Sequence, residues 1–243
     1  MSEVQLPEPD RIEGAPHPRE TPRLFGQGLA QEAFLEAFAA GRMHHGWLLT
    51  GPRGVGKATL AWQVARFLLA QPQEGQGAGL FGAAPGADSL DLAPEHPVAR
   101  RVAAGSEPGL FVLRRGPNDK GNALSAQIRV DEVRRLKSFF SLSATEGGRR
   151  VAIVDAADEM NPSAANALLK LLEEPPARST LLLVAHQPAR LLPTIRSRCR
   201  ELRLKPLAPA ELAAALDQAG LAPEGDVAAL SELSGGSVGA AVR

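Results

Sequence analysis

The sequence predicts an α/β fold, in which a parallel five-stranded sheet is flanked by helices and is followed by a small all-helical domain. Short apolar segments of strand length alternate with helical segments, which is typical of parallel sheets with right-handed crossovers. Residues 150–204 are the clearest case, because they read as strand, helix, strand, short helix and strand. From residue 206 the pattern is purely helical. We therefore expect an α/β domain over residues 23–205 and a helical domain over residues 206–243.

Five segments are predicted as the strands of the sheet, because each is short and mostly apolar and is bounded by turn residues. Residues 151–154 (VAIV) are apolar at every position, as expected of a strand buried on both faces. The other predicted strands are residues 47–50, 109–113, 180–185 and 200–204. Polar residues at the ends of these strands are the candidates for chemistry.

Helices are predicted by apolar residues that recur with helical spacing and by their start and stop signals. In one of them Asn161 can cap the first N–H groups and Pro162 suits the first helical position, while two prolines at residues 175–176 end it. Its predicted apolar stripe is Ala165, Leu168, Leu169 and Leu172. Further helices are expected at residues 28–41, 60–69, 97–104, 128–142, 207–220, 226–233 and 237–243.

Two stretches lie outside this alternating pattern. Residues 1–22 contain five prolines and little periodicity, so we expect an extended or disordered lead-in. Residues 71–108 are rich in Gly, Pro and Ala, which indicates a long insertion with one short helix. The sequence assigns no role to this insertion.

The composition excludes several classes of protein. With 27 basic and 27 acidic residues the formal net charge is zero, whereas an autonomous nucleic-acid binder usually carries a basic excess. The single cysteine, Cys199, excludes an intramolecular disulfide and a cysteine-based zinc site. The sequence has neither an apolar run of membrane-spanning length nor a signal-peptide pattern, so we expect a cytoplasmic protein.

A glycine-rich loop between a predicted strand and a predicted helix is the strongest candidate for a phosphate site. It reads Gly-Pro-Arg-Gly-Val-Gly-Lys-Ala-Thr over residues 51–59. Its glycines let successive N–H groups point at a phosphate, the helix adds its positive N-terminal end, and Lys57 would reach the terminal phosphates. The nucleotide-binding candidates are Gly51, Gly54, Gly56, Lys57 and Thr59.

The loop departs from its motif at the position that binds magnesium. A Ser or Thr should follow the lysine, because its hydroxyl ligates Mg²⁺, but this residue is Ala58. Thr59 lies about 100° further round the helix and should not substitute. The loop is therefore expected to be degenerate.

Two more polar positions lie at joints of the sheet. The strand at residues 151–154 is followed by Asp155, where nucleotide-hydrolysing domains place the carboxylate that organises their metal ion. Ser197, Arg198 and Cys199 come directly before the last predicted strand, so an arginine lies at that joint. Cys199 is most simply a small buried residue, since no nearby base would activate its thiol.

Together, these motifs resemble the AAA+ clamp-loader ATPases over roughly residues 20–243. The most specific segments are NALLKLLEEPP at residues 166–176 and PTIRSRC at residues 193–199. The resemblance implies an AAA+ P-loop domain with a helical lid, and an Arg198 that acts as an arginine finger on a neighbouring subunit. The alternative for Arg198 is a surface ion pair. Expected interface residues are Asn166, Glu174, Ser197 and Cys199.

The resemblance also implies that catalytic groups of the family are absent here. The family's Asp-Glu-Ala-Asp motif reads Asp-Ala-Ala-Asp, so Ala156 replaces the glutamate that polarises water. Asp155 and Asp158 remain as a degenerate Walker B motif. The family's polar sensor residue aligns near His186 or Gln187.

A third group is missing near the C-terminus. The family's Gly-Ser-x-Arg segment, whose arginine touches the terminal phosphate, matches residues 236–239, and its arginine position is Gly239. The Mg²⁺ hydroxyl, the water-polarising glutamate and the sensor arginine are thus lost together. We expect the shape of an ATPase without its turnover.

The resemblance implies a subunit of a hetero-oligomeric ring. Its expected partners are the gamma/tau motor and delta subunits, the sliding clamp, and primer–template DNA through the complex, with no membrane partner. No cofactor is expected to be required, although ATP could be held without hydrolysis. The zinc module of some relatives is not expected, because residues 71–108 contain no cysteine. A C-terminal collar domain of the family is absent, so we expect a truncated chain or a shortened subunit.

Three alternatives stay open from the sequence. An active AAA+ ATPase could use Thr59 with Asp155 and Asp158 in an unusual metal arrangement. A subunit could instead hold ATP as a structural ligand through Gly56 and Lys57. A DNA-repair AAA+ protein fits the fold, but it does not fit NALLKLLEEPP followed by Ser-Arg-Cys.

Overall fold

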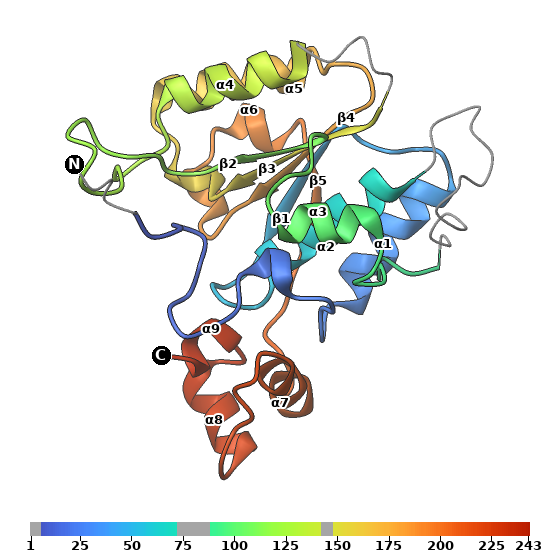
Figure 1. Cartoon of the computed structure of the whole chain (residues 1–243), viewed down its shortest axis with the longest axis vertical. Coiled ribbons are helices and arrows are strands. Elements are labelled where there is room, and N and C mark those ends of the chain that lie inside the picture. The colour runs from blue at the N-terminus through green and yellow to red at the C-terminus, as the bar shows by residue number, and fades with distance from the viewer. Residues whose placement is uncertain (1–5, 72–87, 142–147) are drawn as a thin grey trace.

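The computed structural model describes residues 6–71, 88–141 and 148–243. Its centre is a five-stranded sheet with the order β2-β3-β4-β1-β5, in which every neighbouring pair is parallel (Figure 1). The strands are β1 (Gly46–Thr50), β2 (Leu110–Leu113), β3 (Arg150–Asp155), β4 (Ser179–Val184) and β5 (Arg200–Arg203). The predicted parallel sheet is confirmed, with strand ends within one residue of those expected.

Nine α-helices connect and follow the strands in the described part of the chain. In Figure 1, α4, α5 and α6 lie on one side of the sheet, α1, α2 and α3 lie on the other, and α7, α8 and α9 form a separate group below it. The helices are α1 (Gly28–Ala39), α2 (Lys57–Ala70), α3 (Pro97–Ala103), α4 (Val130–Ser141), α5 (Pro162–Glu173), α6 (Pro193–Arg196), α7 (Pro209–Gln218), α8 (Val227–Ser234) and α9 (Val238–Ala241).

The core has two halves, one on each face of the sheet. Alternate residues of a strand point to opposite faces, so Ile153 and Leu182 pack against α1 and α2. Ala152, Val154 and Leu181 pack against α4 and α5. Apart from the half-buried Arg150, every residue of β3 and β4 is buried, which explains the continuous apolar runs.

Helix α5 begins as its sequence predicts but buries a slightly different face. The Asn161 side chain accepts a hydrogen bond from the Ala164 N–H at 2.8 Å, and Pro162 occupies the first turn. Leu169, which we expected in the apolar stripe, is only half-buried, and Leu171 is buried in the core. The sheet and α4 both contact this helix, so its buried face is wider than a single stripe.

The segment before the sheet differs from the expected lead-in. Residues 6–22 are described and fold back on the domain, with a short 3₁₀ helix at Pro18–Glu20 and a completely buried His17. Prolines disfavour the interiors of helices and sheets, but they leave an irregular chain free to pack through its side chains. Residues 1–5 lie outside the described residues, as do residues 72–87 of the insertion.

The register brings the ends of three strands to one edge of the sheet. Leu49 of β1 and Asp155 of β3 both pair with Val184 of β4. The segments that follow these strands therefore begin side by side at the carboxyl edge, where ligands bind in open α/β sheets. Within the described ranges, no helix is both long enough and apolar enough to cross a membrane.

Candidate nucleotide site and exposed arginine

The phosphate loop lies between β1 and α2 at the carboxyl edge. Gly51, Gly54 and Gly56 have φ angles of +136°, +76° and +101°, which side chains rarely allow. An added Cβ at Gly51 would lie 2.5 Å from the Leu204 carbonyl oxygen. The glycines thus let the loop curl tightly against the end of β5 before α2 begins at Lys57.

The Lys57 amine binds the loop itself. Its Nζ donates to the carbonyl oxygens of Gly51 at 2.7 Å and Pro52 at 2.5 Å, and the residue is buried. Burial lowers the pKa of Lys57 to about 8, with the nearby charges of Asp155 and Asp158 opposing the shift. A phosphate would have to compete with these carbonyls for the amine.

Asp155 is the last residue of β3 and lines the same cavity as Lys57. Burial, and then the charges of Asp10 and Glu159, raise the pKa of this carboxyl group to about 7. The Lys57 charge lowers it only partly. The carboxyl group is therefore partly protonated near neutral pH, and a protonated carboxyl is a poor ligand for a divalent cation.

Asp158 organises the loop after β4. Its Oδ1 accepts from the His186 N–H at 2.9 Å and its Oδ2 accepts from the Gln187 N–H at 3.1 Å. The family resemblance places Asp158 and these two residues in separate motifs. In the structure, two backbone N–H groups donate to the Asp158 carboxylate and so join the motifs. The pKa of His186 is lowered to about 4 by burial and then by the charges of Lys57 and Arg53, so its imidazole is neutral at pH 7.

The site does not fit the family's magnesium ion. Ala58 occupies the position of the hydroxyl ligand, and Thr59 lies on the next position of the first turn of α2. Among the described residues, no group of three or more His, Cys, Asp or Glu could hold a metal ion. At the position after Lys57, the chain therefore supplies no hydroxyl ligand for magnesium.

The position expected for the family's water-polarising glutamate holds an alanine in this chain. Ala156 is buried and carries no carboxylate. Glu159, three residues on, contacts Arg115 Nε at 2.9 Å and Arg53 Nη2 at 3.8 Å. Its carboxylate is thus engaged by two arginines, a pairing that the sequence motif did not reveal.

The lid touches the phosphate loop where the family has its sensor arginine. Ser237 Oγ donates to the Arg53 carbonyl at 2.8 Å, and the Gly239 N–H donates to the Gly54 carbonyl at 3.4 Å. A Cβ added at Gly239 would lie 3.1 Å from the Gly54 Cα and 2.7 Å from a methyl carbon of Ile12. Gly239 is therefore a point of close contact between the lid, the loop and the N-terminal segment.

A cavity of about 450 Å³ lies between the phosphate loop, the lid and the N-terminal segment. Its volume is within the range of roughly 300–1,000 Å³ that is usual for small-molecule sites. Residues of all three parts line it, among them Pro18, Leu24, Gly56, Thr59, Ala215 and Gln218. The space could admit a nucleotide, although Asp10, Asp155 and Glu159 add negative charge beside Lys57.

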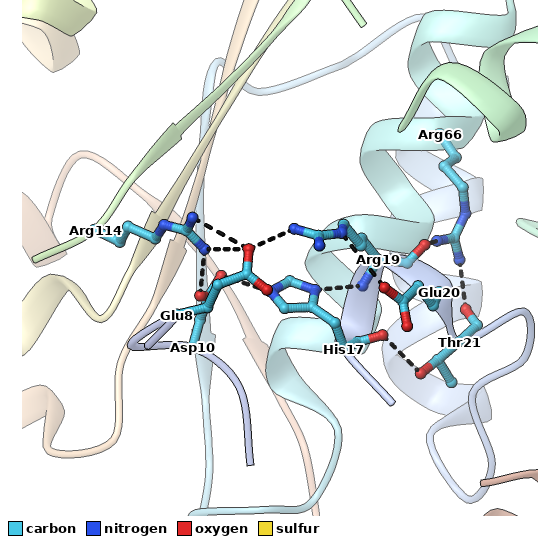
Figure 2. A network of polar contacts seen from close by, with 8 residues as sticks. All are labelled: Glu8, Asp10, His17, Arg19, Glu20, Thr21, Arg66 and Arg114. Atoms are coloured by element: carbon cyan, nitrogen blue, oxygen red, sulfur yellow. Dashed lines mark hydrogen bonds and ion pairs between the residues drawn. The ribbon is translucent and has the colours of Figure 1, made fainter. Parts of the chain in front are cut away.

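A polar network holds residues 8–21, which we call the N-terminal strap, on the α/β domain (Figure 2). From the end of β2, Arg114 contacts Asp10 at 2.6 Å and Glu8 at 3.3 Å, while Arg19 contacts Glu8 at 2.6 Å. The His17 Nε2 lies 3.2 Å from the second Asp10 oxygen. Burial alone would raise the pKa of Asp10, but His17 and Arg114 hold it below its usual value.

Helix α2 supplies a second anchor for the strap. Arg66 donates to the carbonyl oxygens of Arg19 at 3.0 Å and Thr21 at 2.9 Å (Figure 2). Trp62 packs edge-on against the His17 ring, with 5.6 Å between the ring centroids. The strap is thereby fixed beside the cavity. Composition gave no signal for it, because its partners lie far away in the sequence.

Arg198 lies at the opposite edge of the sheet from the phosphate loop. A Cβ added at Gly46, the first residue of β1, would lie 3.2 Å from the Arg198 carbonyl, whereas Gly51 follows the last residue of β1. Four strand rises of about 3.3 Å separate the two ends, or roughly 13 Å. The Arg198 guanidinium is bonded at its own edge and does not face Lys57.

The Arg198 guanidinium has two partners within the chain. Its Nη2 lies 3.0 Å from Glu173 Oε1 and its Nη1 donates to the Thr194 carbonyl at 3.1 Å, while 37% of the side chain is exposed. Glu173 was not among the predicted site residues, although it adjoins the predicted Glu174. The ion pair was the alternative for Arg198, and it leaves part of the guanidinium open to solvent.

The other predicted interface residues surround this edge. Asn166 and Glu174 are exposed on or after α5, and Ser197 is exposed with its Oγ donating to the Thr194 carbonyl at 3.1 Å. Cys199 is half-buried, and burial raises the pKa of its thiol to about 12. A thiol with this pKa stays protonated at neutral pH, which leaves it without nucleophilic reactivity.

Comparison with known proteins decides the family. Residues 26–208, most of the chain, match the family model described as "DNA polymerase III, delta subunit". The chain belongs to this family. The parallel sheet, the glycine-rich loop after β1 and the C-terminal group of helices are consistent with this membership.

Several relatives of the chain are named DNA polymerase III subunit delta′. The chain is 43% identical to subunit delta′ of Pseudomonas aeruginosa over 155 residues, 64% of this chain and 41% of the relative. It is 34% identical to subunit delta′ of Escherichia coli over 175 residues, 72% of this chain and 46% of the relative. The chain thus spans less than half the length of these relatives.

The AAA+ fold is shared more widely than the family. A gamma/tau subunit of DNA polymerase III from Mycobacterium bovis is 31% identical over 200 residues, 80% of this chain and 31% of the relative. The solved structure of the Thermotoga maritima RuvB Holliday junction branch migration motor covers 92% of this chain, with 63% of that chain matched. Its TM-score is 0.53 at 18% identity, so this likeness concerns the fold alone.

Proposed function

We propose that this chain is a delta′-like clamp-loader subunit that does not hydrolyse ATP and that donates Arg198 to the ATP site of a neighbouring motor subunit. The observation that carries this proposal is the position of Arg198. Its partly exposed guanidinium lies at the edge of the sheet opposite its own phosphate loop, so a site on another subunit is the one it can serve.

The proposed partners follow from the family and its relatives. They are gamma/tau motor subunits and a delta subunit in a hetero-oligomeric ring, which would place a sliding clamp on primer–template DNA. In the neighbouring site, the guanidinium would stabilise the charge that develops on the transferred phosphoryl group. Fingers of this kind raise the rate by about 10³–10⁵ in other phosphoryl-transfer enzymes.

The chain's own site supports the absence of hydrolysis. Ala58 offers no hydroxyl to magnesium and Ala156 offers no carboxylate to water. The nearest glutamate, Glu159, is engaged by Arg115 and Arg53. Gly239 replaces the sensor arginine with a backbone contact to the phosphate loop. Each change removes a different contribution to the transition state, so one compensating residue would not restore turnover.

A second candidate is a structural ATP ligand held without hydrolysis. The cavity of about 450 Å³ beside an intact glycine loop favours it. Against it, the Lys57 amine is already bonded to two loop carbonyls, and Asp10 and Asp155 place carboxyl groups near the phosphate position. Equilibrium dialysis with ATP and with Lys57→Ala as control distinguishes the two forms of the proposal.

The proposal is tested first by ATP hydrolysis with the isolated chain and Mg²⁺, compared with Lys57→Ala. We expect no turnover from either protein. Turnover that disappears with Lys57→Ala would instead identify a working ATPase and contradict the non-hydrolysing assignment.

The finger is tested in a complex reconstituted with gamma/tau and delta subunits. Arg198→Ala should abolish the share of ATP turnover contributed by the adjacent motor site, while the variant chain still folds and joins the complex. Arg100→Ala, an exposed arginine on α3, is the matched control and should leave turnover unchanged. Unchanged turnover with Arg198→Ala would rule out the finger assignment.

A further inference from the structure

We infer that Glu173 is a positioning residue for Arg198, an inference that rests on the finger role proposed above. Glu173 Oε1 lies 3.0 Å from Arg198 Nη2, and the Thr194 carbonyl accepts from Arg198 Nη1 at 3.1 Å. One terminal nitrogen is thus held by a hydrogen bond and the other by an ion pair. Together the two contacts restrict the orientation of the guanidinium before any neighbour arrives.

The remaining donors of Arg198 are free for a partner. A guanidinium has five N–H groups in a fixed fork. Within the chain, Nη1 donates one hydrogen bond to the Thr194 carbonyl and Nη2 forms an ion pair with Glu173. Since 37% of the Arg198 side chain is exposed, the unused N–H groups can face a phosphate oxygen of an adjacent subunit. Orienting this fork in advance reduces the entropy that must be lost in the transition state.

The C-terminal end of α5, which carries Glu173, is held in place by a contact to the start of β1. Glu173 is the last residue of α5, and the carbonyl of the preceding Leu172 accepts from His45 Nε2 at 2.9 Å. His45 directly precedes β1, so the end of α5 is tied to the start of a strand that lies between β4 and β5. The backbone that carries Glu173 is thereby held against the sheet.

Helix stability does not explain a glutamate at this position. The C-terminal end of a helix carries partial negative charge, which disfavours an acidic side chain there. The pair with Arg198 is 43% exposed on the glutamate side and 37% on the arginine side, and ion pairs so accessible to solvent contribute little to folding. Orientation of Arg198 is the role that the contacts support.

The experiment compares Glu173→Ala and Glu173→Gln in the reconstituted complex, measuring kcat and KM for ATP. Glu173→Ala should lower the Arg198-dependent part of kcat by roughly threefold or more with little change in KM, because orientation matters most in the transition state. Glu173→Gln keeps an acceptor oxygen and should lose less. Glu36→Ala, an exposed glutamate in the last turn of α1, should match the unsubstituted protein.

A double substitution separates positioning from any independent effect. In an Arg198→Ala background, Glu173→Ala should cause no further loss, since its partner is gone. A further loss there would overturn the inference, as would a normal kcat for Glu173→Ala while Arg198→Ala is impaired. If Arg198→Ala itself has no effect, both the finger proposal and this inference fail. Thermal unfolding should show near-identical Tm values for all single variants at these positions.

Discussion

Gly239 of the lid and Gly54 of the phosphate loop are in backbone contact. The Gly239 N–H donates to the Gly54 carbonyl at 3.4 Å, and a Cβ added at Gly54 would lie 2.8 Å from the Gly239 nitrogen. The family resemblance predicts, at this lid position, an arginine that contacts the terminal phosphate. In this chain, the lid rests directly on the loop, with Ser237 adding a hydrogen bond to the Arg53 carbonyl.

Because of this contact, we expect an arginine at residue 239 to destabilise the fold. Gly239→Arg should destabilise the fold by about 1–3 kcal/mol, because the side chain must displace the Gly54 backbone or the Ile12 side chain. Urea unfolding measures the change. Ala240→Arg, on an exposed position of the same helix, is the control and should stay within about 0.5 kcal/mol. Equal stability of the two variants would contradict the close contact.

The pKa of Asp155 predicts a pH-dependent effect of Asp155→Asn. The folded pKa of about 7 lies above the usual 3.8, so the folded state binds the proton more tightly than the unfolded state. The stability of the unsubstituted protein therefore falls as the pH rises from 3.8 to about 7. The variant carries no such charge. Its stability relative to the unsubstituted protein should therefore increase by about 2–4 kcal/mol between pH 4 and pH 8.

Denaturant unfolding of both proteins at several pH values measures this difference. His186, with its pKa lowered from 6.5 to about 4, acts in the opposite direction between those values. Its effect is common to both proteins, so the difference between them isolates Asp155. A difference that stays constant from pH 4 to pH 8 would show that the Asp155 carboxyl is not perturbed.

The network of the N-terminal strap predicts strong coupling between Arg114 and Asp10. Arg114→Ala would leave the Asp10 carboxylate, whose side chain is 1% exposed, with His17 as its remaining ion-pair partner among the described residues, and should cost about 2–4 kcal/mol. The double variant Arg114→Ala with Asp10→Ala should recover part of this loss, because no buried charge remains. Chemical unfolding of Arg114→Ala, Asp10→Ala and the double variant, with Arg100→Ala as the control, measures the coupling.

The same network has a defined pH dependence. Because the pKa of Asp10 is lowered on folding, its stabilisation is present above the usual value of 3.8 and is lost as the pH falls through the folded pKa. The cost of Arg114→Ala should therefore be full at pH 7 and should shrink in acid. Additive single effects at pH 7 would show that Arg114 and Asp10 are not paired.

Much of the fold could be predicted because its signals are local. The apolar run at residues 151–154 and the Asn161-Pro162 start of α5 depend on neighbours in the sequence, and both have the structure expected. The buried face of α5 was predicted less well, since Leu171 and Leu169 differ only in how the sheet and α4 pack around the helix. The packing of residues 6–22 was missed, because proline content reports on regular structure and not on side-chain burial.

The sequence by itself determined the alternation of strands and helices and the place of the phosphate loop, and with the family resemblance it predicts the loss of catalytic groups at Ala58, Ala156 and Gly239. Each of these depends on residue identity at a known spacing. Only the tertiary structure decided which distant groups meet, such as Gly54 with Gly239, Asp10 with Arg114, and Glu173 with Arg198. Such pairs depend on the path of the folded backbone and on side-chain rotamers, which local patterns do not encode.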